Sequence, residues 1–202
     1  MTSRGTRAPL PTTLVHDDEI GSAMSNDYTI RTATTDDAAA CAAIYAPYVR
    51  ETAITFETDP PSVEEMARRI AAANEQHVWL VMEVDGEIVG YAYGGKFAQR
   101  AAYRWATEGS VYLDMNRRGA GRGRALYAAL IERLRDRGYR RFVGVVALPN
   151  EPSMRLHRAF GFAEMGVMRN IGWKHDAWHD VAYLGLNLTP GEDLTIAPPE
   201  VS

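Results

Sequence analysis

Cysteine is nearly absent from this sequence, and so are long apolar runs. Cys41 is the single cysteine among 202 residues, so no intrachain disulfide and no thiolate zinc cluster can form. It lies in the alanine-rich run AAACAAIY, which is typical of a small buried side chain rather than a catalytic thiol. No apolar stretch approaches the roughly 20 residues that a membrane helix needs, and the first residues lack the apolar core of a secretory signal. We therefore expect a cytoplasmic protein.

An excess of positive charge is lacking as well. The chain has 22 lysines and arginines against 26 aspartates and glutamates, a formal net charge of −4. General binding to nucleic acid or to an anionic membrane favours a basic surface, so neither partner is expected. Hydrophobic residues at 46% and charged residues at 24% are ordinary for a globular protein, and the length suits one domain.

Composition divides the chain into one domain and two tails. Residues 1–26 and 189–202 mix proline, threonine, glycine and charge without periodicity, so we expect flexible tails on either side of a domain over residues 27–188. Periodicity and turn residues predict the order β-α-α-β-β-β-α-β-α-β-β. The predicted strands are 27–34, 78–84, 87–95, 109–115, 140–148, 163–173 and 180–188, and the predicted helices are 34–49, 62–73, 123–138 and 150–162. These elements indicate an α/β fold with a mixed central sheet flanked by helices.

Three local signals within this order are specific. Asp85-Gly86 between two strand-like runs is the dipeptide that a type I′ hairpin turn prefers. Ser62 and Glu65 have capping-box spacing at the start of a helix. One predicted helix has a continuous apolar face, formed by Leu126, Tyr127, Leu130, Ile131 and Leu134.

The loop between a predicted strand and that amphipathic helix is rich in arginine and glycine. Such a turn is a ready phosphate site, because the first N–H groups of a helix have no intrahelical partner and glycines permit close approach of an anion. A P-loop would need a lysine followed by serine or threonine after the glycines, and a Rossmann fingerprint would need a third glycine at position 124, which is arginine, and an acid after the next strand. Both patterns fail. A solvated loop or an RGG-like nucleic-acid segment stays open on the loop alone.

A third phosphate pattern fits residues 118–123. The run RGAGRG matches [QR]-x-x-G-x-[GA] and resembles the pyrophosphate-binding signature of the GNAT N-acetyltransferases, whose donor is acetyl-CoA. Four further segments resemble those of the phosphinothricin and methionine sulfoximine N-acetyltransferases. They are YRWATEGSVYLD, VVALPNEPSMRLHRAFGF, GWKHDAWHDV and IYAPYVRETAITFET. The resemblance covers about residues 27–188 in the right order.

The resemblance implies a GNAT fold and assigns residues to the donor. Val111, Tyr112 and Leu113 would form the splayed strand that pairs with the pantetheine arm. Asn150 and Ser153 would contact the pantetheine at the next helix. The pyrophosphate would bind Arg118, Gly119, Ala120, Gly121, Arg122, Gly123 and Arg124. The enzymes it resembles are homodimers, so a homodimer is expected.

Two residues are candidates for acid–base chemistry. Glu108 matches the general base proposed for the family, and a carboxylate beside the thioester suits that task, because an amine must lose a proton before it attacks. His157 stands where many relatives carry a tyrosine that protonates the leaving thiolate; it contacts the cofactor and is a candidate acid. His175 and His179 have the spacing of a zinc pair, but no glutamate lies between them and no helix is predicted there, so no metal is expected.

The acceptor is expected to be a small amino-acid-like amine. Arg100 and Tyr103 match positions that recognise its carboxylate in the enzymes that this chain resembles. Ala98 departs from their pattern, because the phosphinothricin enzymes have a lysine there; Lys96 is nearby but is expected to project differently. The expected reaction is direct attack in a ternary complex. The alternatives are a protein N-terminal acetyltransferase, which needs an open peptide groove, a non-catalytic acetyl-CoA-binding module, and an RNA-binding protein.

Overall fold

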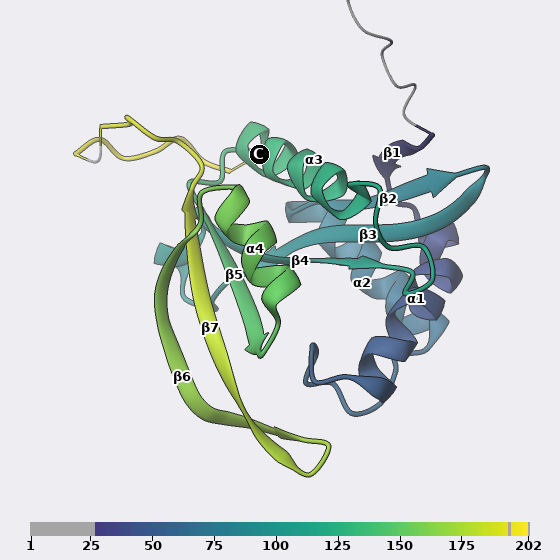
Figure 1. The fold of residues 1–202 in the computed structure, drawn as a ribbon. Helices are drawn as coiled ribbons and strands as arrows, with labels where there is room; N and C mark the ends of the chain where they lie inside the picture. Colours follow the sequence, from purple (N-terminus) through teal and green to yellow (C-terminus); the bar gives the residue numbers. More distant parts are fainter. Residues whose placement is uncertain (1–26, 194, 202) are drawn as a thin grey trace, which may run out of the picture.

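The protein folds around one mixed sheet with helices on both faces (Figure 1). The computed structural model describes residues 27–193 and 195–201, so the predicted tail at 1–26 lies outside the described residues. The seven strands lie in the order β1-β2-β3-β4-β5-β7-β6. Their bounds are β1 Thr29–Thr32, β2 Trp79–Val84, β3 Glu87–Lys96, β4 Ala106–Leu113, β5 Arg141–Leu148, β6 Ala163–Lys174 and β7 Ala177–Asn187. The predicted α/β fold with a mixed sheet is confirmed.

Four helices and two short 3₁₀ segments complete the described fold. The helices are α1 Ala38–Glu51, α2 Val63–Gln76, α3 Arg122–Asp136 and α4 Glu151–Ala159, with η1 Thr35–Asp37 and η2 Ala101–Tyr103. Residues of α3 and α4 pack into one core cluster and residues of α1 and α2 into another, on the two faces of the sheet. No helix in the described part of the chain is both long and apolar enough to span a membrane.

The local sequence signals formed as predicted. Asp85 and Gly86 have φ values of 52° and 80°, the left-handed pair of a type I′ turn. The Ser62 side chain accepts a hydrogen bond from the Glu65 amide and caps α2. All five apolar residues of the predicted α3 face are buried. Cys41 is fully buried, and burial raises the pKa of its thiol to about 12, as befits a packing role.

The bounds predicted for the last two strands were wrong. β6 continues to Lys174 and β7 begins at Ala177, so the two form one long hairpin that extends away from the helices (Figure 1). Its turn residues, His175 and Asp176, have φ values of 51° and 56°. Glycine or asparagine usually occupies positions with such positive φ values. Because neither residue is present in this turn, the sequence did not indicate it.

The segment predicted as a C-terminal tail contacts the domain. The indole Nε1 of Trp105 donates to the carbonyl oxygen of Pro199 at 2.8 Å. Arg104 forms an ion pair with Glu200, and Val201 packs against the core cluster that includes α3. These contacts involve residues far apart in the sequence, and no local pattern indicated them.

Candidate active site

A cleft opens where the central parallel strand pair separates. β4 and β5 pair only from Ala106–Arg141 to Glu108–Val143, and beyond that point they diverge (Figure 1). The amide of Asp114 faces β3, where it donates to Val89 at 2.9 Å. Because backbone groups alternate along a strand, the N–H and C=O of Val111 face the gap towards β5. These two backbone groups lie beyond Glu108–Val143, the last residue pair between β4 and β5.

The cleft brings together many of the predicted donor-binding residues. Its lining includes Val111 and Tyr112 from β4 and Asn150, Ser153 and His157 from α4. Asn150 caps α4, because its Oδ1 accepts from the Ser153 amide at 3.2 Å. Leu113 continues β4, and its carbonyl oxygen accepts a hydrogen bond of 2.6 Å from the Tyr48 hydroxyl, a contact that the sequence did not indicate.

The glycine-rich loop presents its backbone at the start of α3. Gly119, Ala120 and Gly121 have consecutive φ values of 99°, 49° and 72°, and Gly121 is the N-cap of the helix. A Cβ at Gly119 or Gly121 would meet no atom within 4 Å, so it is the backbone conformation rather than crowding that favours glycine there. Successive positive φ values followed by a helix N-terminus form an anion-binding backbone surface.

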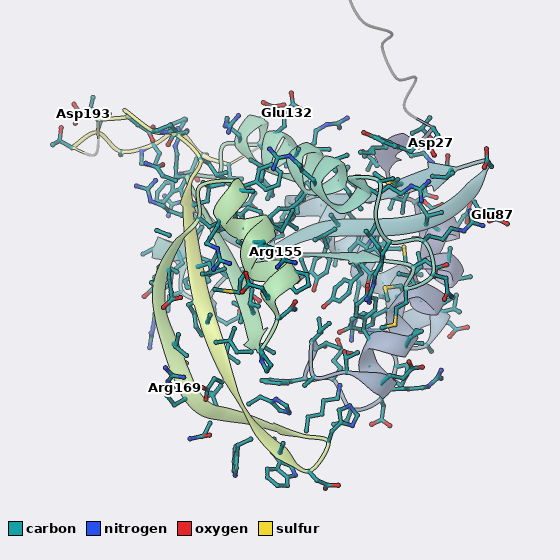
Figure 2. The ribbon with its side chains drawn as sticks, viewed as in Figure 1. Asp27, Glu87, Glu132, Arg155, Arg169 and Asp193 are labelled. Atoms are coloured by element: carbon teal, nitrogen blue, oxygen red, sulfur yellow. The ribbon has the colours of Figure 1, made fainter. Side chains whose placement is uncertain are left out.

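Two of the four arginines of the loop form an ion pair with a carboxylate. Arg117 pairs with Glu87, and Arg122 pairs with Asp27 at 3.0 Å; Figure 2 shows both carboxylates at the end of the sheet where this loop lies.

Arg118 and Arg124 have no carboxylate partner among the ion pairs of residues 27–193 and 195–201. Arg118 lies over the ring of Tyr48 at 5.3 Å, and Arg124 lies over Phe160 at 5.0 Å. These two guanidinium groups are therefore available to phosphates.

Glu108 lies on β4 at the point where β4 and β5 part. It is opposite Gly95 of β3 and half-buried, and burial raises the pKa of its carboxyl group. Its side chain shares the α1–α2 face of the sheet with Ser110 and Tyr112, since strand side chains alternate. Tyr93 is diagonal to it; burial raises the pKa of that phenol, and the charge of Glu108 adds to the effect. A carboxyl group with a raised pKa is suited to general-base catalysis.

His157 is buried, and both its ring nitrogens are engaged. Nδ1 lies 2.8 Å from the Ser153 carbonyl oxygen, and Nε2 lies 3.0 Å from the Tyr127 hydroxyl. A carbonyl only accepts, so Nδ1 carries the proton and Nε2 accepts from Tyr127. Burial lowers the pKa of this imidazole, although the Ser153 carbonyl opposes the effect. The sequence missed Tyr127 as a site residue, because its helical spacing identified it only as core.

The loop between α1 and α2 is held against the tip of the β6–β7 hairpin. The buried Lys174 ammonium donates to the carbonyl oxygens of Thr55 at 2.7 Å and Glu57 at 2.8 Å. The Phe56 ring packs against Gly172, where a Cβ would overlap it. His175 lies 3.2 Å from a carbonyl of the same loop, and His179 lies 2.9 Å from the Lys174 carbonyl. No cluster of three or more metal-ligating side chains occurs in the part of the chain that the structure describes.

The Glu57 side chain connects this loop to α1 and α2. Its carboxylate accepts from Tyr45 at 3.1 Å and from Arg69 at 2.7 and 3.2 Å. Arg69 also donates to Glu65 at 2.8 Å. These charges are on the same side of the sheet as Glu108, and no short motif in the sequence linked them.

Two cavities lie beside β3 on this side of the molecule. The inner cavity, of about 370 Å³, is bounded by α2 and β3 and lined by Arg69, Trp79, Tyr91, Tyr93 and Gly95 among others. The outer cavity, of about 320 Å³, contains the predicted carboxylate-binding residues Arg100 and Tyr103 together with Ala106.

Both cavities are lined by Gln76, His77 and Lys96. Glu108 lines neither, but it pairs with Gly95 of the inner cavity and lies two residues from Ala106 of the outer one. Lys96, which was expected to project differently from a lysine at position 98, thus lines both cavities.

Comparisons with known proteins identify the family of this chain. The chain matches the model of the acetyltransferase (GNAT) domain over residues 30–182. It belongs to the GNAT acetyltransferases.

Two curated relatives are enzymes with small acceptors. The enzyme is 37% identical over 154 residues to a phosphinothricin N-acetyltransferase of Streptomyces viridochromogenes, covering 76% of this chain and 84% of the relative. It is 36% identical over 163 residues to an L-methionine sulfoximine/L-methionine sulfone acetyltransferase of Pseudomonas paraeruginosa, covering 80% and 95%.

One similar solved structure contains acetyl-CoA, an acetyl donor. The phosphinothricin acetyltransferase of Sinorhizobium meliloti in complex with AcCoA superimposes with a TM-score of 0.81 at 35% identity, over 86% of this chain and 94% of that one. The co-substrate of this acetyltransferase is acetyl-CoA, and the residues present fit it. The cleft between β4 and β5 presents free backbone groups for an amide-bearing arm, and the loop before α3 joins two unpaired arginines to a helix N-terminus.

Proposed function

We propose that this enzyme transfers the acetyl group of acetyl-CoA to the α-amino group of a small amino-acid-like acceptor, such as phosphinothricin or methionine sulfoximine, by direct attack in a ternary complex. The observation that carries the proposal is the position of Glu108, a half-buried carboxylate with a raised pKa, where β4 and β5 separate. Along β4, Glu108 lies between Ala106 of the outer cavity and Gly109 of the donor cleft.

The donor side of the proposal uses the cleft and the loop. The backbone of Val111 pairs with the pantetheine arm and polarises the thioester carbonyl, an oxyanion-hole type of stabilisation. The N–H groups of residues 119–124 hold the pyrophosphate, and Arg118 and Arg124 add charge. Asn150 and Ser153 contact the arm from α4. Gly119 through Gly123 are thereby assigned to backbone contacts rather than side-chain chemistry.

In the chemical step Glu108 takes a proton from the acceptor ammonium, directly or through one water. The neutral amine forms an N–C bond to the thioester carbon, the C–S bond breaks, and coenzyme A leaves as its thiolate. The new amide nitrogen loses its second proton, which the thiolate takes up through solvent, so coenzyme A is released as the free thiol. Proton delivery by His157 requires an imidazolium, which burial disfavours. The hydrogens of the His157–Tyr127 pair are already donated, from Nδ1 to Ser153 and from the Tyr127 hydroxyl to Nε2, so we assign to this pair a contact that positions the cofactor arm in the cleft. Cys41 is buried and plays no part.

The acceptor side uses the two cavities. Arg100 and Lys96 bind the carboxylate, and Tyr103 adds a hydroxyl. The aromatic floor of the inner cavity, made by Trp79, Tyr91 and Tyr93, accommodates an apolar side chain. Cavities of this volume favour a small amino acid over the N-terminus of a folded protein.

A homodimer is part of the proposal. The β6–β7 hairpin exposes apolar side chains along its length: Met165, Met168, Ile171, Trp173 and Trp178 are between 48% and 59% exposed. A patch of this kind on an otherwise polar surface marks a protein interface. We also propose a cytoplasmic location, to which the free, buried cysteine is suited.

Release of free thiol from acetyl-CoA tests the function. Phosphinothricin, methionine sulfoximine, methionine sulfone, natural amino acids and an alanine-terminated peptide form the panel. We expect turnover with at least one free amino acid and a kcat that falls by roughly 10²–10⁴ in Glu108→Gln, with acetyl-CoA affinity retained. Glu132→Gln, an exposed change on α3 (Figure 2), is the matched control. Turnover with the peptide alone, or full activity of Glu108→Gln, contradicts the proposal.

A further inference from the structure

The C-terminal segment, residues 195–201, lies beyond the part of the chain that matches the family model, which ends at residue 182. It returns to the domain and ends beside α3, where Figure 1 marks the C-terminus. Trp105 donates to the Pro199 carbonyl oxygen at 2.8 Å, and Arg104 donates twice to the Glu200 carboxylate, at 3.1 Å each.

This segment forms one wall of the outer cavity. Glu200 and Val201 line it together with Arg100, Tyr103 and Ala106. Arg104 and Trp105, which hold the segment, directly follow η2, and η2 includes Tyr103. The C-terminus is therefore attached to the same stretch of chain that carries the predicted carboxylate-binding residues.

The same contact neutralises one of the cations of the outer cavity, which is also lined by the carboxylate of Glu75. Arg104 is paired with Glu200, whereas Lys96 and Arg100 have no partner among the ion pairs of the described residues. Ala106 precedes Glu108 by two residues on β4, so their side chains are on one face about 7 Å apart. Glu108 therefore adjoins, along β4, the wall of this cavity that Ala106 forms.

We propose that residues 195–201 are an acceptor-specificity element: they close the outer cavity around a small amino acid with a free carboxylate, and Glu200 limits the cavity to one such acid group by neutralising Arg104. The inference rests on the proposed function and adds to it the part of the chain that restricts acceptor size and charge. Larger amines are excluded by the wall, and a second acid group on the acceptor lacks a third free cation.

Two variants test the wall and the charge separately. A chain that ends at residue 194 should raise the KM of the best small acceptor about tenfold, with the KM of acetyl-CoA unchanged, and should improve kcat/KM for a dipeptide relative to a single amino acid. Glu200→Gln frees Arg104 and should lower the KM of phosphinothricin two- to fivefold relative to that of methionine sulfone; the effect is small because the pair is exposed. Thr195→Ala is the control, because this hydroxyl donates to Asp193 and Thr195 does not line the outer cavity.

The outcomes separate the two claims. Wild-type turnover combined with an unchanged acceptor KM and unchanged selectivity in both variants overturns this inference and leaves the proposed function standing. Absence of turnover in the wild type overturns the proposed function and the inference together. If the shortened chain does not fold, the selectivity ratio of Glu200→Gln decides.

Discussion

Replacing Lys174 by methionine tests how the acceptor side is held together. The ammonium is buried and donates to two carbonyls of the α1–α2 loop, at 2.7 and 2.8 Å. Methionine keeps most of the volume and apolar length and removes both hydrogen bonds. The loop that carries Phe56 and Glu57 then loses both hydrogen bonds from Lys174, although the His175 contact with the loop and the Phe56 ring over Gly172 can remain.

The expected loss follows from those two bonds. A hydrogen bond to a charged group contributes about 1.5–3 kcal/mol, and a buried carbonyl left without a donor costs about 1–3 kcal/mol. Burial of the ammonium costs free energy in the native protein, as the lowered pKa of Lys174 indicates, and this offsets part of the loss. A net destabilisation of about 2–4 kcal/mol is expected, which for a chain of this size lowers Tm by roughly 4–16 °C.

Thermal unfolding and steady-state kinetics together check this reasoning. The acceptor KM should rise several-fold, because Glu57 of this loop holds Arg69 of the inner cavity. The KM of acetyl-CoA should rise less, because the loop contributes a single side chain, Ile54, to the donor cleft. Arg68→Met, at a side chain that is 77% exposed, is the control and should change stability by less than about 0.5 kcal/mol. A Tm for Lys174→Met equal to that of Arg68→Met, with an unchanged acceptor KM, would refute the positioning role.

Three further changes probe the base, the phosphate loop and the dimer. Burial raises the pKa of Glu108, so wild-type stability falls as pH rises from the ordinary glutamate value near 4.3 to the raised one. Glu108→Gln should therefore raise Tm at pH 7 and leave it unchanged below about pH 4; a Tm difference independent of pH contradicts the assignment. Arg118→Gln should raise the KM of acetyl-CoA roughly tenfold, about 1.4 kcal/mol, whereas Arg117→Gln, whose guanidinium pairs with Glu87, should change it less than twofold. If the proposed dimer forms through the hairpin, Trp178→Lys should convert it to a monomer in sedimentation; a wild-type dimer whose mass the substitution leaves unchanged excludes the hairpin as the interface.

Local patterns predicted those features whose cause is itself local. The Asp85-Gly86 turn, the Ser62 cap and the apolar face of α3 each depend on residues within a few positions of one another. The phosphate loop was also readable, because a strand, a glycine-rich turn and a helix N-terminus follow each other directly in the chain. Glu108 was identified through family resemblance and its strand position, before any contact of its side chain was known.

Features that join distant segments were not readable. The bond between Tyr127 and His157 links positions 30 residues apart, and Lys174 meets its partners across more than 115 positions. Lys96 was expected to project differently from a lysine at position 98, and only the fold shows that it lines both cavities. Neither spacing nor composition carries information on which loop a side chain meets after the sheet has formed.

By itself, the sequence determined the order of strands and helices and the family, because short-range propensity and patterning encode them, and it predicted the contiguous loop to which we assign the donor phosphates. Only the tertiary structure decided which two of the four loop arginines remain unpaired, that His157 holds Tyr127, and that Glu200 and Val201 border the outer cavity. The physical reason is that charge pairing and cavity shape depend on distances between side chains, and those distances are set only when strands far apart in the chain pack into one sheet.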